Sequence, residues 1–213
     1  MRPPQDWQRA RVTIVIAAIT ALAWLIVQAI GRQQSASVVA GFISAQVDVL
    51  RGTDLLVALF VTPLTATLLH SNLFHIVFNL VVLLACGRAV ENILGSRAIV
   101  LLYVAGAYVA AFFHYLAWPH DVVPMIGASG AISAIVGAWV MLFGPRRANA
   151  ANPALTRWLQ ILWLLATWIV LNLLIGYAFE LGGARLAVAA HIGGFLVGLI
   201  LAKPLLLLKW RGA

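Results

Sequence analysis

Long apolar runs, separated by short polar breaks, dominate this sequence. Six of these runs are long enough to cross the roughly 30 Å hydrocarbon core of a bilayer as helices. We expect the membrane-spanning helices at about 12–30, 68–90, 98–118, 127–143, 158–179 and 186–208. Turn-forming residues fill the breaks, as in Gly144-Pro145 and Gly182-Gly183. The pattern therefore predicts an all-α polytopic membrane protein, a bundle of six transmembrane helices.

The segment 31–67 breaks this pattern. It contains apolar stretches, but Gln33-Gln34-Ser35, Arg51-Gly52-Thr53-Asp54 and Thr62-Pro63 interrupt them. It is too apolar for a free linker and too interrupted to span a membrane. We expect a loop with short helices that lie in the interface or pack on the bundle. A second loop is expected at 148–156, between the fourth and fifth spans.

Composition agrees with a membrane protein and limits the domain count. Of the 213 residues, 63% are hydrophobic and 9% charged, and the mean hydropathy is +1.01. A soluble domain of this size cannot bury that much apolar surface. The length suits a single transmembrane domain over 1–213. The lone cysteine, Cys86, excludes an intramolecular disulfide.

Charge distribution predicts the topology. Six spans place both termini on one side of the membrane. That side holds eleven of the 14 basic residues: Arg2, Arg9, Arg11, Arg88, Arg97, Arg146, Arg147, Arg157, Lys203, Lys209 and Arg211. Only Arg32, Arg51 and Arg185 fall on the other side. The positive-inside rule then makes both termini cytoplasmic, and it explains the net charge of +8 without a nucleic-acid partner. The first span lacks a clear cleavage site, so we expect it to be retained.

Polar side chains within the spans are costly and mark buried networks or functional cavities. They are His70, His75, Asn79, His114, Ser129, Asn172 and His191. Four of them fall on one level, on the order of 5–15 Å below the extracytoplasmic surface at about 1.5 Å per residue. These four are His75, Asn79, Ser129 and His191. Three helices far apart in sequence thus direct polar groups to one layer.

Ser129 is the candidate nucleophile and His191 the candidate base. Taken alone, Gly127-Ala128-Ser129-Gly130 is typical of a small-residue packing face. Gly194 and Gly198, however, form a Gly-x-x-x-Gly face that lets the sixth span approach the small-residue fourth span closely. That packing would bring His191 within hydrogen-bond range of Ser129, which pairs a nucleophile with a base.

Serine attack on an amide also needs donors for the developing oxyanion. The backbone N–H of Ser129, at a helix start, lacks an intrahelical acceptor. The side chains of His75 and Asn79, four residues apart on one helical face, can add two more donors. None of the six acidic residues is placed to orient His191, so we predict a Ser–His dyad rather than a triad.

In these residues and their order, the chain resembles the rhomboid intramembrane serine proteases of the bacterial six-span type. The matching pieces, in order, are His70–Asn79, Gly87-Arg88-Ala89-Val90-Glu91 with Gly95-Ser96, Gly127–Gly130, and Ala190-His191 with Gly194 and Gly198. The resemblance implies Ser129 as nucleophile, His191 as general base, and His75, Asn79 and the Ser129 backbone as oxyanion donors. Glu91 looks like the family's cytoplasmic-side structural acid, with a solvated charge at a helix end as the alternative.

The resemblance also implies partners. Substrates would be single-pass transmembrane proteins, cut near the extracytoplasmic side of a bacterial inner membrane, with no cofactor and no metal. The fifth span is a candidate gate, with Trp163 and Trp168 as either gating or lipid-facing bulk. In some rhomboids an aromatic residue four after the serine stacks on the histidine. Ser133 stands there in this chain, so His191 is expected to be held differently.

Two other function classes compete with the protease. A non-catalytic rhomboid-like protein would bind membrane clients without cutting them, but such relatives lack the serine or the histidine, and both are present here. A small transporter or a haem or metal protein could use His70, His75, His114 and His191. Their spacing shows no i,i+3 or i,i+4 ligand pair, and no acidic residue lines a midplane path.

Overall fold

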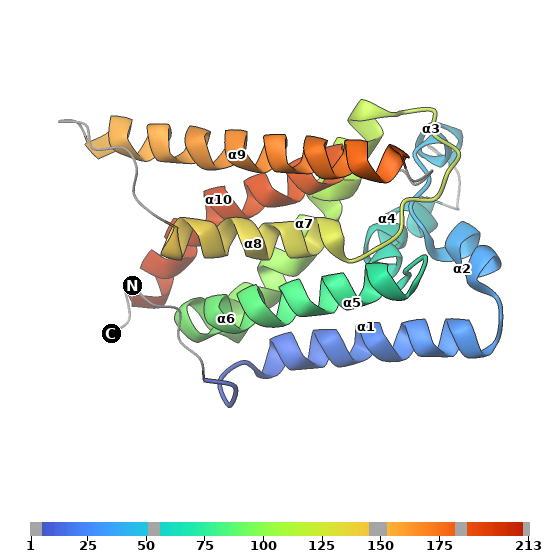
Figure 1. Cartoon of the computed structure of the whole chain (residues 1–213), viewed down its shortest axis with the longest axis horizontal. Helices are drawn as coiled ribbons and strands as arrows, with labels where there is room; N and C mark the ends of the chain where they lie inside the picture. The colour runs from blue at the N-terminus through green and yellow to red at the C-terminus, as the bar shows by residue number, and fades with distance from the viewer. Residues whose placement is uncertain (1–5, 51–55, 145–152, 182–186, 211–213) are drawn as a thin grey trace.

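A computed structural model describes residues 6–50, 56–144, 153–181 and 187–210. The described chain is a bundle of helices (Figure 1). In order, they are α1 (Arg11–Ala29), α2 (Gln33–Ala40), α3 (Ala45–Leu50), α4 (Leu56–Thr65), the 3₁₀ helix η1 (Ala66–Leu68), α5 (Leu73–Val82), the π-helical turn η2 (Leu83–Gly87), α6 (Arg88–Leu94), α7 (Ser96–Ala117), α8 (Ser129–Phe143), α9 (Pro153–Leu181) and α10 (Val188–Trp210). The short helices expected between 31 and 67 are confirmed, whereas the turn at Gly182-Gly183 lies outside the described residues.

Five helical segments in the described ranges are long and apolar enough to cross a membrane: Arg11–Ala29, Leu73–Leu94, Ser96–Ala117, Ala154–Asn172 and Val188–Lys209. The protein is therefore a multi-pass membrane protein. The expected fourth span is the exception, because α8 has only 15 residues. At about 1.5 Å per residue it measures roughly 22 Å, less than the roughly 30 Å of a hydrocarbon core.

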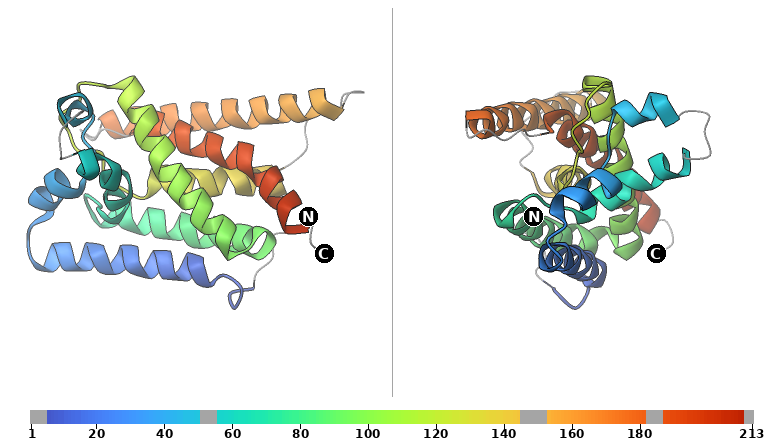
Figure 2. Two further views of the ribbon diagram at one scale, coloured as in Figure 1. Left: turned by 180° about the vertical axis from the view of Figure 1, so that it is seen from behind. Right: turned by 90° about the vertical axis from the view of Figure 1, so that its right-hand side faces the viewer.

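The short helix α8 lies in the interior of the bundle. All nine residues from Gly130 to Ala138 are buried. Figure 1 shows α8 between α9 and α5, and the reverse view in Figure 2 shows α7 and α10 crossing its other side. Because neighbouring helices bury α8 from Gly130 to Ala138, this part of the helix does not need to reach both membrane surfaces to stay buried.

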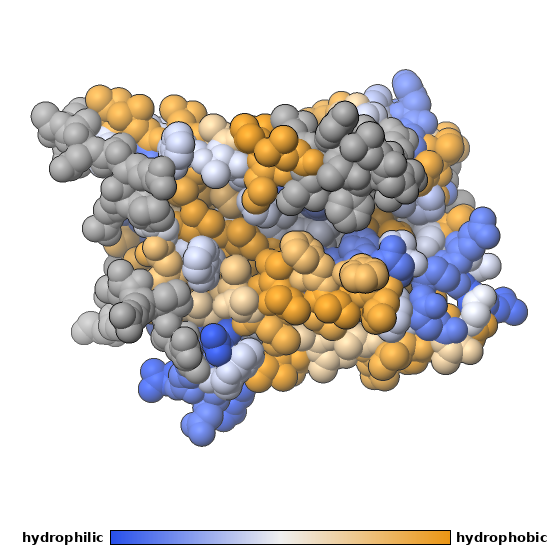
Figure 3. Space-filling view, viewed as in Figure 1, coloured by the Kyte–Doolittle hydropathy of each residue, from blue (hydrophilic) through white to orange (hydrophobic). Residues whose placement is uncertain are grey.

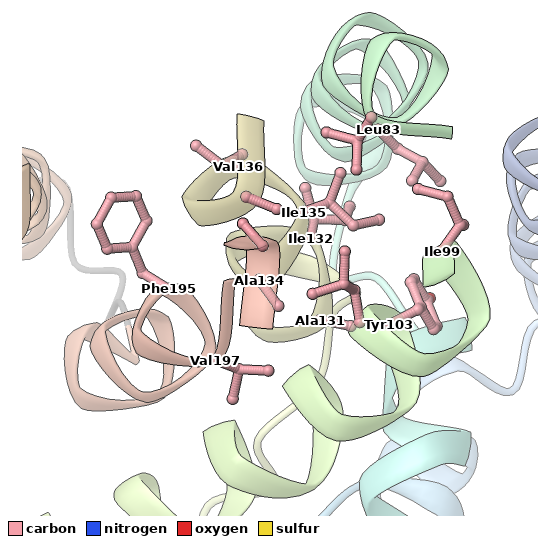
Figure 4. Close-up of a cluster of buried hydrophobic side chains, with 14 of the residues drawn as sticks. Leu83, Ile99, Tyr103, Ala131, Ile132, Ala134, Ile135, Val136, Phe195 and Val197 are labelled. Carbon is pink, nitrogen blue, oxygen red and sulfur yellow. The ribbon is translucent and has the colours of Figure 1, made fainter. Parts of the chain in front are cut away.

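Small residues bring α10 against α8. A Cβ atom on Gly194 would overlap the carbonyl oxygen of Gly130, and one on Gly198 would overlap that of Ala134. Larger apolar side chains fill the space around these contacts. Figure 4 shows Ile132, Ile135 and Val136 of α8 in the same cluster as Phe195 of α10 and Ile99 of α7. The Gly-x-x-x-Gly face expected from the sequence is thus a contact between helix backbones.

The two ends of the bundle differ in charge. One end, on the left in Figure 1, holds the start of α1, the α6–α7 turn and the ends of α8 and α10. The Lys209 Nζ donates there to the carbonyl of Ile93 at 2.8 Å, and the Asn92 side chain donates to that of Asp6 at 2.8 Å. Figure 3 shows a band of hydrophobic residues across the middle of the visible face. The described basic residues Arg9, Arg11, Arg88, Arg97 and Lys209 belong to elements that meet at the α1-start end.

Several expected boundaries were wrong. The second span, expected at 68–90, begins at Leu73, because Asn72 caps α5 and Ala66–Leu68 forms the separate helix η1. A π-helical turn at Leu83–Gly87 then interrupts the span before α6. The fifth helix begins at Pro153 rather than Trp158, because proline is favoured in the first turn of a helix. Residues 153–156 of the loop expected at 148–156 are therefore helical, and 148–152 lie outside the described residues.

Glu91 joins three helices at the α1-start end. Its carboxylate accepts hydrogen bonds from the Val12 and Thr13 backbone N–H groups at 3.0 and 2.8 Å. The hydroxyls of Thr13 and Ser96 also donate to it, each at 2.7 Å. Only 1% of the residue is exposed. The expected structural acid is therefore confirmed, and the alternative of a solvated charge at a helix end is wrong.

Candidate active site

Ser129 is the first residue of α8, reached through a loop that other parts of the chain fix in place. Gly127 has a φ of +115°, a backbone conformation that side-chain-bearing residues rarely adopt. Its N–H donates to the carbonyl of Ala66 at 2.9 Å. Two residues earlier, Met125 exchanges backbone hydrogen bonds with Phe42 at 2.8 and 3.0 Å. These bonds place the Ser129 hydroxyl at the inner end of the loop, at the start of a buried helix.

His191 of α10 lies beside this hydroxyl. The distance between His191 Nε2 and Ser129 Oγ is 2.7 Å, although 62 residues separate them in sequence. The contact between Gly194, about one turn after His191 on α10, and the backbone of Gly130, the residue after Ser129 on α8, holds α10 close enough for this hydrogen bond. The hydrogen bond that the sequence predicted between the two side chains is present.

His75 of α5 approaches the same point from the opposite side. A Cβ atom on Gly127 would come within 2.6 Å of His75 Nε2 and 3.7 Å of Ser129 Oγ, so both side chains border the bare face of this glycine. His75 Nδ1 lies 3.2 Å from the hydroxyl of Ser71. His75 Nε2 therefore lies close to the Ser129 hydroxyl, on the side of the serine that faces α5.

Asn79 lies one turn further along α5 and is 3% exposed. Its amide nitrogen donates to the carbonyl of His75 at 2.9 Å, which uses one of its two N–H groups. The second N–H stays available. The structure thus brings Ser129, His191 and His75 together, and it places Asn79 behind His75 on the same helix.

His70 supports the loop before the nucleophile. It is fully buried, and its Nε2 accepts a long hydrogen bond from the backbone N–H of Ala128 at 3.4 Å. Its ring lies edge-on to that of His75, with 4.8 Å between the centroids. Burial lowers the pKa of His70 below the usual histidine value, and the positive charge of a protonated His75 lowers it further. A neutral ring can accept this hydrogen bond from the Ala128 N–H, whereas an imidazolium, with both nitrogens protonated, cannot.

Asn172 of α9 is a site residue that the sequence did not assign. Its carbonyl oxygen lies 2.8 Å from His191 Nδ1, on the side of the ring opposite to Ser129. The sequence marked Asn172 as a polar residue within a span, but spacing alone did not show which helix it would face. Ser133 does not contact the base, because its hydroxyl donates to the Ser129 carbonyl at 2.7 Å. The imidazole is therefore held from α9 rather than by a ring on α8.

The two tryptophans proposed for the gate have different surroundings. Trp163 is 48% exposed on the outer side of α9. Trp168 is partly buried and stacks on Phe195 of α10, with 4.6 Å between ring centroids and 7° between planes. Its indole N–H also donates to the backbone carbonyl of His191 at 3.2 Å. Trp163 is therefore exposed on the surface of the bundle, while Trp168 joins α9 to α10.

A small cavity lies next to the serine. It has a volume of about 20 Å³, room for roughly one water molecule, and Ile126, Gly127, Ser129, Gly130 and Ala190 are among the residues that line it. Among the described residues, no group of three or more His, Cys, Asp or Glu side chains is placed to hold a metal ion. The fold and the site together define a multi-pass membrane protein that holds a serine hydroxyl against a histidine inside its helix bundle.

Comparison with known proteins places this chain in a family. The rhomboid domain model matches residues 59–208, which include every candidate site residue named above. The chain belongs to the rhomboid family.

Individual relatives agree with this assignment. The rhomboid protease GluP of Bacillus subtilis is 30% identical over 142 residues, which cover 67% of this chain and 25% of GluP. The rhomboid protease GlpG of Pectobacterium atrosepticum is 32% identical over 137 residues, covering 63% of this chain and 45% of GlpG. GlpG of an Enterobacter species is 31% identical over 147 residues. The chain spans a quarter to just under half of the length of the curated relatives it matches.

Proposed function

We propose that this protein is an intramembrane serine endopeptidase in which Ser129 attacks the scissile carbonyl. The single observation that carries the proposal is the 2.7 Å contact between Ser129 Oγ and His191 Nε2. In this contact His191 takes the hydroxyl proton as the new C–O bond forms, and it later gives that proton to the leaving amine. The acyl-enzyme ester is then hydrolysed by water, for which the cavity beside Ser129 has room.

Three donors are available for the negative charge that develops on the carbonyl oxygen. The N–H of Ser129 projects from the start of α8, where the helix supplies no acceptor. His75 Nε2 borders the bare face of Gly127, and Asn79 has one uncommitted N–H. Each such donor is worth about 2.7–4 kcal/mol of transition-state stabilisation. In this proposal His75, Asn79 and the Ser129 backbone form the oxyanion hole.

The proposed substrates are the transmembrane segments of single-pass proteins. GluP and GlpG, the relatives described above, are named rhomboid proteases. A substrate helix has to unwind locally at the cut, because helical amides are hydrogen-bonded and shielded. The proposed preference is for small residues at the cut and helix-weakening residues nearby, because the helix-weakening residues ease that unwinding.

The proposed topology counts α8 as a sixth crossing of a single domain, 1–213, with both termini cytoplasmic. The basic residues at the α1-start end support this orientation. Ser129 begins α8 at the opposite end, so cleavage takes place toward the extracytoplasmic side of a cell membrane, the bacterial inner membrane. If the other end of α8 reaches the cytoplasmic boundary, Ser129 lies about 8 Å inside the hydrocarbon core.

The test uses the full chain in lipid nanodiscs, with a panel of transmembrane reporters and a fluorophosphonate probe of activated serines. Wild-type protein should cut at least one reporter and take up the probe. Ser129→Ala and His191→Ala should lose both activities. Ser37→Ala is the matched control, because Ser37 lies on α2 and its hydroxyl only donates to the Gln33 carbonyl. A wild type that binds the reporters but neither cuts nor labels favours the alternative, a non-catalytic client-binding protein.

A further inference from the structure

Helices α9 and α10 present matched pairs of residues to each other. Trp168 and Asn172 are four residues apart on α9, and so are His191 and Phe195 on α10, so each pair shares one helical face. Trp168 stacks on Phe195, and Asn172 contacts His191 one turn away. The helices run antiparallel in Figure 1, as this pairing requires. Asn172 is 4% exposed and His191 7%, so lipid reaches neither side chain freely.

The surrounding hydrogen bonds fix the orientation of the Asn172 amide. Its nitrogen donates to the carbonyl of Trp168 at 2.9 Å. A backbone carbonyl can only accept, so this contact requires the NH₂ end of the amide. The carbonyl oxygen of Asn172 is then the end that faces His191, where it needs a donor.

This orientation determines the tautomer of the base. Because the Asn172 oxygen can only accept, His191 Nδ1 must carry the proton of the neutral ring. The lone pair is then on Nε2, the nitrogen that lies 2.7 Å from Ser129 Oγ. The opposite tautomer would direct an N–H at the serine hydroxyl and leave two acceptors facing each other at Nδ1. Only the first tautomer can receive the Ser129 proton.

We propose that Asn172 is a positioning residue that completes a Ser129–His191–Asn172 triad. This proposal deepens the proposed serine-protease function and rests on it. During attack the Ser129 proton moves to His191 Nε2, while the Nδ1 proton stays in place and bonds to Asn172. Asn172 neither gains nor loses a proton. Its amide dipole stabilises the imidazolium without placing a second formal charge in an apolar bundle, where a charge is costly.

A purely structural role for Asn172 is the competing explanation, and α9 offers a matched control for it. The Thr167 hydroxyl also donates to the carbonyl four residues earlier, that of Trp163, at 2.9 Å. Thr167 is exposed, however, and its hydroxyl bonds within α9 rather than to His191. Thr167→Val and Asn172→Leu therefore each remove one side-chain hydrogen bond to the α9 backbone, but only Asn172→Leu removes the acceptor at His191.

The experiment measures turnover of a transmembrane reporter together with ¹⁵N NMR of histidine-labelled protein, with His191→Ala used to assign the His191 signal. We expect Asn172→Leu to lower kcat by about 10- to 100-fold with little change in KM, and the Nδ1–H signature of His191 to disappear. Thr167→Val should leave both unchanged. Asn172→Asp, which restores an acceptor, should recover much of the lost kcat.

The results separate the two proposals. An unchanged kcat in Asn172→Leu, or a wild-type His191 protonated at Nε2 instead of Nδ1, overturns the triad. A wild type that cuts no reporter overturns the proposed protease function, while its ¹⁵N spectrum still reports whether Asn172 fixes the tautomer. If Asn172→Leu does not fold, the wild-type spectrum and the kcat of Asn172→Asp decide the question. A loss of kcat in Thr167→Val equal to that in Asn172→Leu also contradicts the proposal.

Discussion

Gly194 of α10 rests directly on the backbone of Gly130 in α8, so closely that a single added methyl group would overlap the Gly130 carbonyl oxygen. Both glycines lie within one turn of the proposed catalytic pair, since Ser129 precedes Gly130 and His191 is three residues before Gly194. The distance between the two helices therefore also sets the distance between nucleophile and base.

Gly194→Ala should uncouple these two residues. The methyl group has to push α10 away from α8, and overpacking of this kind costs about 1–3 kcal/mol or more. We expect a lower Tm and at least about a 100-fold loss of turnover, because Ser129 and His191 move apart. Ile200→Ala on the exposed side of α10 serves as the control, and it should change stability by only about 0.5 kcal/mol. Wild-type turnover in Gly194→Ala would contradict this coupling.

Gly127→Ala should reduce activity more than a comparable glycine replacement elsewhere. Alanine at this position has to adopt a φ of +115°, and its Cβ would lie 2.6 Å from His75 Nε2. Gly31 is the matched control, because it also has a positive φ (65°) but has no atom within 4 Å of the added Cβ. Gly31→Ala therefore reports an uncrowded positive φ within the left-handed region, where the strain is about 1–2 kcal/mol. We expect probe labelling of Ser129 to fall sharply only in Gly127→Ala, and equal labelling of the two variants would refute the role of the His75 contact.

Asn79→Ala should slow cleavage without abolishing it. If Asn79 is one oxyanion donor among three, its loss lowers kcat by about 100-fold and leaves KM nearly constant. Asn92→Ala provides the control, since Asn92 donates to the Asp6 carbonyl at the other end of the bundle. Steady-state kinetics on a transmembrane reporter measures both variants. A complete loss of activity, equal to that of Ser129→Ala, would show that Asn79 does more than donate one hydrogen bond.

Glu91→Gln should lower stability while leaving the activity of folded molecules intact. The carboxylate accepts four hydrogen bonds, and glutamine would turn an NH₂ group toward at least one of those donors. A buried donor left without an acceptor costs about 1–3 kcal/mol. Asp6→Asn, which removes an exposed ion pair with Arg9, should cost at most about 1 kcal/mol. Thermal unfolding in detergent compares the two variants, and equal Tm values would contradict the structural role of Glu91.

The sequence predicted the helices and the central contact because these depend on local pattern. Runs of apolar residues located α1, α7 and α10 within a few residues, and the Gly-x-x-x-Gly face indicated which helix would bring His191 to Ser129. Changes of helix type within an apolar run left no trace in the hydrophobic pattern. The π-helical turn at Leu83–Gly87 lies inside a continuous apolar stretch, so the sequence predicted one unbroken span. The length of α8 was overestimated by two residues, because Gly127 and Ala128 are as apolar as the helix that follows.

Asn172 shows a second limit of prediction from the sequence, namely which neighbouring helix a polar residue will face. The sequence placed an amide within the fifth span, but its partner depends on the rotation of α9 relative to α10, which the stack of Trp168 on Phe195 fixes. Acids are the usual groups that orient a catalytic histidine, and none of the six acids of the chain is placed by the sequence to reach His191. An amide that shares a helical face with an aromatic residue, opposite a histidine with the same spacing, is the signal that could have identified it.

The paired backbones of Phe42 and Met125 help to stabilise the loop before Ser129. Together with the bond from Gly127 to Ala66 and that from Ala45 to Asp121, they provide hydrogen bonds within the protein for the irregular backbone before Ser129. Non-helical backbone is tolerated at membrane depth only when the protein itself supplies its hydrogen-bond partners. This loop can therefore keep its shape whether lipid or water covers it, so its backbone conformation should not depend on bilayer thickness.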